Sequence, residues 1–212
     1  DIIIEPDSLA QIYETFGRET GIDAFFCSYQ KDTVPQNFSS QYKNLLHHFT
    51  HQQSNEVAAT FCGGYGAIKK SVFQAFEGFD EQYRSLEDIE LGYRLYQAGK
   101  LIRLKKSIQL THLKKYTLAG LIRSDLFHRA IPWTRIMLEK RIWKNDLNTK
   151  WSNIFSLTLA YLMLVSLPMI LFFKPAYILL AAQAGLFLYL NREFYTFVLK
   201  EKGIWFTCQT IA

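Results

Sequence analysis

Two groups of residues in the first half of the chain have the types and spacing to do chemistry. The first is the glycine cluster of residues 61–67 (FCGGYGA), in which Gly63 and Gly64 follow a predicted strand. Glycines let backbone N–H groups approach a ligand closely, so a sugar or a phosphate could bind there. The spacing matches neither the dinucleotide-binding fingerprint nor the P-loop. A plain glycine-rich turn explains the cluster equally well.

The second group is the pair Glu87-Asp88, which opens a predicted helix that Gly99 ends. A carboxylate at a helix start can point into a cleft and remove the proton of an attacking hydroxyl as a general base. Acidic residues also favour helix N-termini for structural reasons alone. Ser85 as N-cap, with Asp88 three residues later, would form a capping box. The pair taken by itself fits both interpretations.

Alternating helix and strand patterns surround these groups and must position them. Apolar periodicity and boundary residues predict helices at residues 8–18, 38–52, 71–76 and 87–98. Runs of β-branched and aromatic residues predict strands at residues 22–29, 57–62, 101–104 and 108–110. This alternation indicates an α/β fold.

The net charge of +5 hides a segregation along the chain. Residues 1–99 carry a net charge of −7, residues 100–150 of +10 and residues 151–212 of +2. This order is typical of a soluble domain, a membrane-surface element and a membrane segment. A soluble protein with one basic face is the alternative. The apolar composition excludes a disordered chain, and three widely spaced cysteines argue against a disulfide scaffold or a zinc module.

Two uncharged runs near the C-terminus predict a membrane region. Residues 154–173 could span about 30 Å as a helix, which is the thickness of the bilayer core. Lys174-Pro175 interrupts the apolar sequence, and residues 176–191 form a second, shorter candidate helix. The basic stretch before the first run predicts that the preceding domain faces the cytoplasm from the plasma (inner) membrane. Residues 116–151 alternate apolar and basic side chains, and we expect Pro132 to divide them into two amphipathic helices at the membrane surface.

In chain order, these segments resemble the family 2 glycosyltransferases, especially the membrane-attached bacterial members. The similar segments are residues 62–73, 77–81 and 86–95, followed by Ala98-Gly99. The resemblance implies a GT-A fold, in which an Asp-x-Asp motif and a divalent metal hold a nucleotide-diphosphate sugar. It also implies inverting transfer, in which a carboxylate deprotonates the acceptor. Asp88 would be that general base, and Glu87 would orient or contact the acceptor.

The resemblance assigns further residues to the donor site. Gly63 and Gly64 would contact substrate. Asp1 would be the last carboxylate of the metal motif, and His112 would serve the metal, magnesium or manganese, or the diphosphate. As alternatives, Asp1 is a strand residue without function and His112 makes an ordinary polar contact.

Arg129 and Trp133 stand where processive members of the family have a Gln-x-x-Arg-Trp motif. The sequence here is Arg-Ala-Ile-Pro-Trp, and this departure argues against processive synthesis. Arg129 could still bind pyrophosphate, and Trp133 could stack on an acceptor sugar.

The sequence therefore predicts three regions. These are the C-terminal half of a GT-A catalytic domain at residues 1–115, interfacial helices at 116–151 and a transmembrane region at 152–212. We expect an N-terminally truncated hexosyltransferase that is inactive as this fragment alone. Its partners would be a nucleotide-diphosphate sugar, a lipid-linked or glycan acceptor and the membrane, with no nucleic acid. A processive polysaccharide synthase and a non-catalytic membrane-anchored sugar-binding module remain as alternatives.

Overall fold

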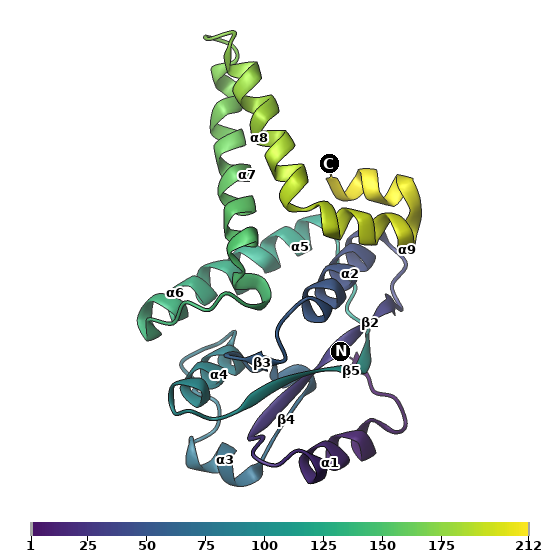
Figure 1. The fold of residues 1–212 in the computed structure, drawn as a ribbon, viewed down its shortest axis with the longest axis vertical. Helices are drawn as coiled ribbons and strands as arrows, with labels where there is room; N and C mark the ends of the chain where they lie inside the picture. Colours follow the sequence, from purple (N-terminus) through teal and green to yellow (C-terminus); the bar gives the residue numbers. More distant parts are fainter. Residues whose placement is uncertain (1, 212) are drawn as a thin grey trace. The chain divides into compact units, whose positions relative to one another are not determined.

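The computed structural model describes residues 2–211, which form an α/β structure with a mixed sheet and many helices (Figure 1). The chain divides into two compact units, with the boundary between Lys144 and Asn145. The α/β class expected from the alternating patterns is confirmed. Residues 116–144 belong to the same compact unit as the sheet.

The first unit is built on a five-stranded mixed sheet whose central strands, β2 and β5, run parallel. The strands are β1 (Ile2–Ile3), β2 (Ala24–Thr33), β3 (Val57–Ala58), β4 (Gly66–Ile68) and β5 (Ile102–His112). The segments 101–104 and 108–110 are one strand, because a register shift at Cys27/Ser28 of β2 absorbs the residues of β5 between them. The predicted strand 57–62 is also wrong in length, since its pairing with β5 ends at Ala58.

Helices cover both faces of this sheet (Figure 1). Alternation along β2 turns Phe25 toward one face, where its ring lies 5.0 Å from that of Phe16, and Phe26 toward the other, where its ring lies 5.9 Å from that of His51. Phe16 belongs to helix α1 (Ser8–Arg18), and His51 belongs to helix α2 (Phe38–Gln52). The helices before β5 are α1 (Ser8–Arg18), α2 (Phe38–Gln52), η1 (Gly63–Tyr65), α3 (Lys70–Ala75) and α4 (Glu87–Gln97).

Gly92 allows α4 to lie directly on the backbone of the chain that leaves β3. A Cβ atom at this position would lie 2.3 Å from the backbone nitrogen of Phe61 and 2.7 Å from the carbonyl carbon of Thr60. No side chain fits at such distances, so glycine is required by close approach. The contact places the first turn of α4 beside the segment that leads into the glycine cluster.

After β5 the chain continues through α5 (Leu118–Asp125), a π-helical turn η2 (Leu126–Ala130) and α6 (Ile131–Lys140). The expected break at Pro132 is absent. Pro132 lies in the first turn of α6, and the N–H of Ile131 bonds to the carbonyl of Leu126, five residues back. Since the hydrogen-bonding pattern is already shifted ahead of the ring, the helix continues without a break.

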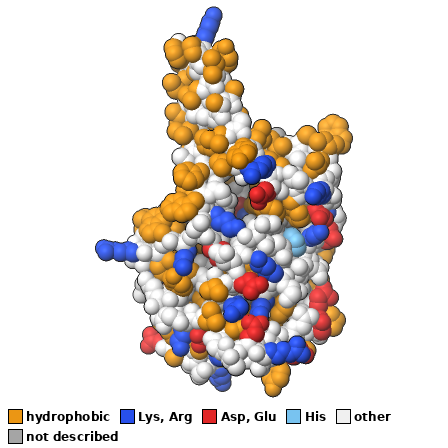
Figure 2. Space-filling model, in the orientation of Figure 1, with side chains coloured by type: hydrophobic (Ala, Val, Ile, Leu, Met, Phe, Trp, Pro, Cys, Tyr) orange, Lys and Arg blue, Asp and Glu red, His pale blue; other side chains and the backbone are white. Residues whose placement is uncertain are grey.

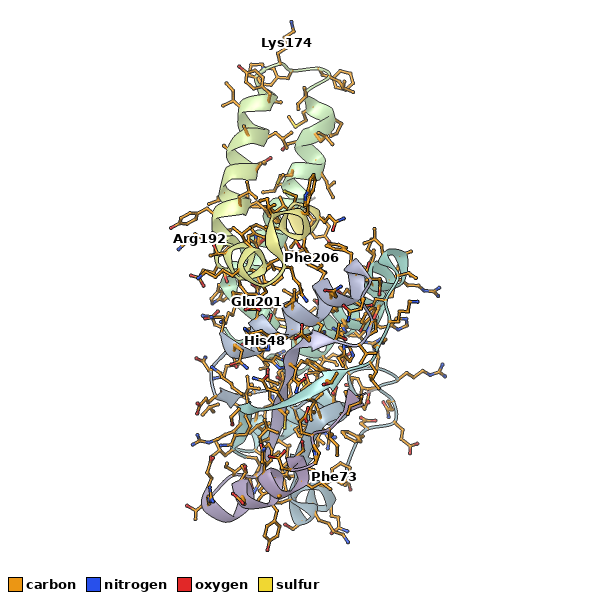
Figure 3. All side chains as sticks on the ribbon, turned by 90° about the vertical axis from the view of Figure 1, so that its right-hand side faces the viewer. His48, Phe73, Lys174, Arg192, Glu201 and Phe206 are labelled. Carbon is orange, nitrogen blue, oxygen red and sulfur yellow. The ribbon has the colours of Figure 1, made fainter. Side chains whose placement is uncertain are left out.

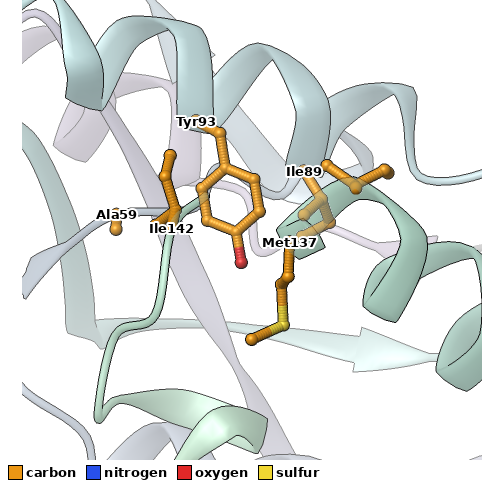
Figure 4. Packing of buried hydrophobic residues seen from close by; sticks show 6 residues of the cluster. Ala59, Ile89, Tyr93, Met137 and Ile142 are labelled. Atoms are coloured by element: carbon orange, nitrogen blue, oxygen red, sulfur yellow. The ribbon is translucent and has the colours of Figure 1, made fainter. Parts of the chain in front are cut away.

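Helix α6 packs on α4 through a small apolar cluster (Figure 4). Tyr93 lies in the middle of this cluster and is 2% exposed. Around it lie Ala59, Ile89, Ile136, Met137 and Ile142. The packing fixes α6, and the π-helical turn before it, against the helix that carries Glu87-Asp88.

The second unit contains η3 (Leu147–Thr149), α7 (Trp151–Met169), α8 (Ala176–Leu190) and α9 (Arg192–Ile211). Among the described residues, α7 is the one helix both long and apolar enough to cross a membrane, and α8 is apolar but shorter. Large apolar side chains are exposed along both helices (Figure 2). Lys174 lies in the turn that joins them (Figure 3), and at the other end Asn191 donates a 2.6 Å hydrogen bond to the hydroxyl of Ser156.

Candidate active site

Asp88 lies in the first turn of α4, where its Oδ1 accepts a 2.8 Å hydrogen bond from the N–H of Ile89. The predicted capping box is wrong, because Leu86 and not Ser85 is the N-cap. Leu86 has φ of 64°, a left-handed conformation that costs roughly 1–2 kcal/mol for a residue with a side chain. This conformation sets the direction in which Glu87 and Asp88 leave the preceding loop. Both side chains are partly buried.

Cys62 connects Asp88 to the glycine cluster. Burial, and after it the nearby Asp88 carboxylate, raises the pKa of the Cys62 thiol to about 12. The thiol is therefore neutral at physiological pH and is not a nucleophile. Cys62 also packs against the cluster that contains Ile89, the residue after Asp88, so the start of α4 lies near the residue that precedes Gly63.

The glycine cluster begins with the short helix η1. Gly64 is exposed, and a Cβ atom there would have no heavy atom within 4 Å. Neither packing nor a left-handed φ requires glycine at position 64 among the described residues. The open space leaves room for a ligand to approach this backbone.

Polar side chains that are buried or partly buried continue from Cys62 toward β5. The Tyr65 side chain is hydrogen-bonded to both Cys62 and Tyr29, and the two tyrosine rings lie 4.5 Å apart. The ring of Tyr29 lies 4.9 Å from that of His112. Burial raises the pKa of both tyrosines, so their hydroxyls stay protonated. These side chains form a continuous row, which we call the polar row: Cys62, Tyr65, Tyr29 and His112.

His112 ends β5 and pairs with Ile2 across the sheet. Burial, and then the positive charges of Arg129 and Lys114, lower the pKa of His112 to about 4. The imidazole is therefore neutral at pH 7, as a metal ligand must be, and its surroundings favour an anion. Asp1, the other predicted metal ligand, lies outside the described residues. Within those residues, no three His, Cys, Asp or Glu side chains are placed to hold a metal.

Arg129 and Trp133 reach the same region from η2 and α6. The Trp133 indole donates a 2.8 Å hydrogen bond to the hydroxyl of Tyr93 on α4. Arg129 donates to Nε2 of His47 at 3.0 Å. After burial, its charge contributes to the lowered pKa of His112, and it partly opposes the rise in the pKa of Cys62. The ring of His47 lies 5.4 Å from that of Tyr29, so the guanidinium lies beside the polar row.

Three of the predicted site residues therefore lie along or beside the polar row. His112 forms one end of it, Arg129 lies beside it through His47, and Asp88 acts electrostatically on Cys62 at the other end. A carboxylate beside an open glycine turn can deprotonate a hydroxyl, and a group of cations near His112 can bind an anion such as a diphosphate.

Sequence reasoning missed the polar residues of α2 that reach this region, notably Lys43 and His47. The usable signal is their i, i+4 spacing, which Asp125 and Arg129 repeat on the opposite helix.

No protein-family model matches the chain, and no curated protein sequence is similar to it.

Proposed function

We propose that this chain belongs to an inverting glycosyltransferase of GT-A type, which moves a sugar from a nucleotide diphosphate to a lipid-linked or membrane-proximal acceptor. One observation carries the proposal. The Asp88 carboxylate and the Arg129 guanidinium both act electrostatically on Cys62, the residue that opens the exposed glycine turn. This transfer requires a base and an anion-binding group near the same exposed turn.

In the proposed reaction, Asp88 takes the proton of the acceptor hydroxyl as its oxygen attacks the anomeric carbon. The bond from that carbon to the diphosphate breaks, and the nucleotide diphosphate leaves with the electron pair. Arg129 and the nearby Lys114 stabilise the negative charge of the leaving group. Glu87, next to the base, orients the acceptor, and Trp133 supplies an aromatic face near it.

Magnesium or manganese would further offset the diphosphate charge when bound. His112 fits a ligand role because its imidazole is neutral. Asp1, which precedes the strand residue paired with His112, would supply a carboxylate.

The second unit supports a membrane location for the acceptor. Helix α7 has 19 residues and the length to cross a bilayer core, and α7 and α8 expose large apolar side chains. We propose that these helices enter the plasma membrane and that the sheet-containing unit works on its cytoplasmic side.

The Asp88→Asn variant of the intact protein tests the reaction. We expect sugar transfer to fall by ~10²-fold or more, with donor binding unchanged, because the amide cannot accept the hydroxyl proton. Release of nucleotide diphosphate and formation of glycosylated acceptor are measured in lipid nanodiscs across a panel of donors. The exposed Glu81→Gln substitution is the matched control and should leave the rate unchanged. Substantial turnover by Asp88→Asn would reject the base assignment, and sugar binding without turnover in the unmutated protein would favour a binding module.

A further inference from the structure

Helix α2 makes a series of polar contacts with the segment that carries Arg129. Near its start, Asn37 donates a 2.6 Å hydrogen bond to the carbonyl of Tyr116, and the hydroxyl of Ser40 accepts a 2.8 Å bond from the N–H of the same residue. One turn further along, Lys43 Nζ lies 2.7 Å from Oδ2 of Asp125. After another turn, His47 accepts the bond from Arg129.

The last two contacts join two i, i+4 pairs on facing helices. Lys43 and His47 lie on one face of α2, and Asp125 and Arg129 lie one turn apart across the junction of α5 and η2. The second carboxylate oxygen of Asp125, Oδ1, is 3.8 Å from Nη1 of Arg129. We call these four side chains the charged square.

Lys43 is the buried member of the square. Its side chain is 7% exposed, while those of Arg129 and Asp125 are 33% and 38% exposed. Burial and then the Arg129 charge lower the pKa of Lys43 to about 8, so the ammonium remains largely charged at pH 7. Burial and then Lys43 hold the pKa of His47 well below its usual 6.5. A neutral His47 can accept the guanidinium N–H through Nε2.

Helix α2 is in turn anchored to the sheet through polar contacts. Asn44 donates to the carbonyls of Gln30 and Lys31 at 2.9 and 2.8 Å, and Nδ1 of His48 lies 2.7 Å from the carbonyl of Tyr29 (Figure 3). Because α2 holds Arg129 and is itself bonded to β2, the position of Arg129 is fixed relative to this central strand.

We propose that Lys43 and His47 are positioning residues, which act through Asp125 and Arg129 to hold the guanidinium beside the polar row, where it binds the diphosphate of the donor. This inference rests on the proposed function. Its physical basis is that Lys43 and Arg129 compete for the Asp125 carboxylate, which lies between them. Without Lys43, the carboxylate would draw the guanidinium to itself and away from the anion.

The test measures binding of inorganic pyrophosphate to the intact protein by calorimetry. Lys43→Met keeps the length and apolar stem of the side chain but removes the charge. We expect it to weaken pyrophosphate binding by roughly tenfold, and Arg129→Ala by tenfold or more, as for the loss of a hydrogen bond to a charged group. Lys43→Arg should restore most of the affinity, and the exposed Lys70→Met is the matched control.

A double-mutant cycle separates positioning from direct contact. If Lys43 acts through Arg129, then Lys43→Met will cause no further loss in the Arg129→Ala protein. Fully multiplicative losses would show that Lys43 binds the anion itself and would overturn the proposal. An unchanged affinity in Lys43→Met, beside a loss in Arg129→Ala, would overturn it while leaving the proposed function intact.

Two further results complete the test. Unchanged affinity in Arg129→Ala would remove both the positioning role and the diphosphate role of Arg129. Asp125→Asn provides a second variant at a more exposed position, where folding is less at risk. Because the amide no longer competes for the guanidinium, adding Asp125→Asn to Lys43→Met should recover most of the lost pyrophosphate affinity. A double variant that binds pyrophosphate no more tightly than Lys43→Met would contradict the proposal.

Discussion

Gly92 is the residue on which the position of Asp88 depends most directly, because α4 touches the backbone of residues 60–61 at this point. We predict that Gly92→Ala lowers the free energy of unfolding by about 2–3 kcal/mol, since the new methyl group must push two backbone segments apart. Gly17→Ala in α1 is the control. A Cβ atom there has no neighbour within 4 Å, so this change should be neutral or stabilising by up to about 1 kcal/mol.

Denaturant titrations of the two variants measure this difference. Equal stabilities would mean that α4 can move away from the strand without cost. If the contact at Gly92 also fixes the position of Asp88, sugar transfer by Gly92→Ala will be slower under conditions where the protein stays folded.

At the same scale, the sequence predicted where the helix of Glu87-Asp88 begins better than it predicted how the chain enters that helix. The helix start at Glu87 was correct, because the apolar periodicity and the acidic first turn both mark it. The Ser85 cap was wrong, since a left-handed Leu86 reverses the chain just before the helix. A leucine in the left-handed conformation is rare, and no sequence pattern predicts it, because tertiary packing imposes the conformation. Leu86 packs against the cluster around Tyr93.

At the scale of the elements, the buried carboxylate of Glu90 fixes the position of α4 through ion pairs. Glu90 is 1% exposed, and its oxygens lie 2.8 and 3.0 Å from Arg94 Nε and 2.8 Å from Lys140 Nζ of α6. Arg94 also donates to the carbonyls of Phe76 and Gly78, in the bend where Glu77 and Gly78 have positive φ. Glu90 therefore ties α4 both to α6 and to the loop before it.

We predict that Glu90→Gln lowers the free energy of unfolding by about 2–3 kcal/mol, because it leaves two partly buried cations without their counter-charge. The control is Glu14→Gln in α1. Glu14 forms an i, i+4 pair with Arg18 at 3.0 Å, but both side chains are more than half exposed, so its loss should cost at most about 1 kcal/mol. Thermal or urea unfolding of both variants checks the prediction, which fails if the two losses are the same.

Helix α2 shows what an element-level pattern can and cannot predict. Its bounds, residues 38–52, were predicted correctly. Its role was not, because Lys43, Asn44 and His48 would ordinarily be read as a solvent-facing side, whereas the structure buries them. Their partners are backbone carbonyls of β2 and a carboxylate 82 residues away, contacts that depend on the folded chain.

For the whole molecule, hydropathy predicted the two apolar helices near the C-terminus, whereas the three predicted regions differ from the two compact units, which meet between Lys144 and Asn145. The runs at 154–173 and 176–191 correspond to α7 and α8. Helix α9 was not predicted, because Lys200, Glu201 and Lys202 interrupt its apolar pattern and Gly203 bends it with φ of 78°. The role of the first run as a membrane span stays a prediction, to be tested by topology.

We predict that a cysteine in place of Lys174 is labelled from the side of the membrane opposite to a cysteine in place of Lys70. Lys174 lies at the turn of the α7–α8 hairpin, and Lys70 opens α3 in the first unit. Sealed vesicles containing the protein with Cys208 replaced by serine are treated with a membrane-impermeant maleimide. Labelling of both cysteines from one side would show that the hairpin does not cross the bilayer.

The π-helical turn has a consequence for how the gene can change in length. A π turn holds one residue more than the α-helical turn it replaces, and the helices on either side keep their faces. Loss of one codon within residues 126–130 would thus leave the Lys43–Asp125 and Trp133–Tyr93 contacts in register. The same loss inside α6 would rotate the rest of that helix by about 100° and turn Ile136 out of its cluster. A one-residue deletion within residues 126–128 should therefore cost less stability than one in α6, although it would displace Arg129 from His47.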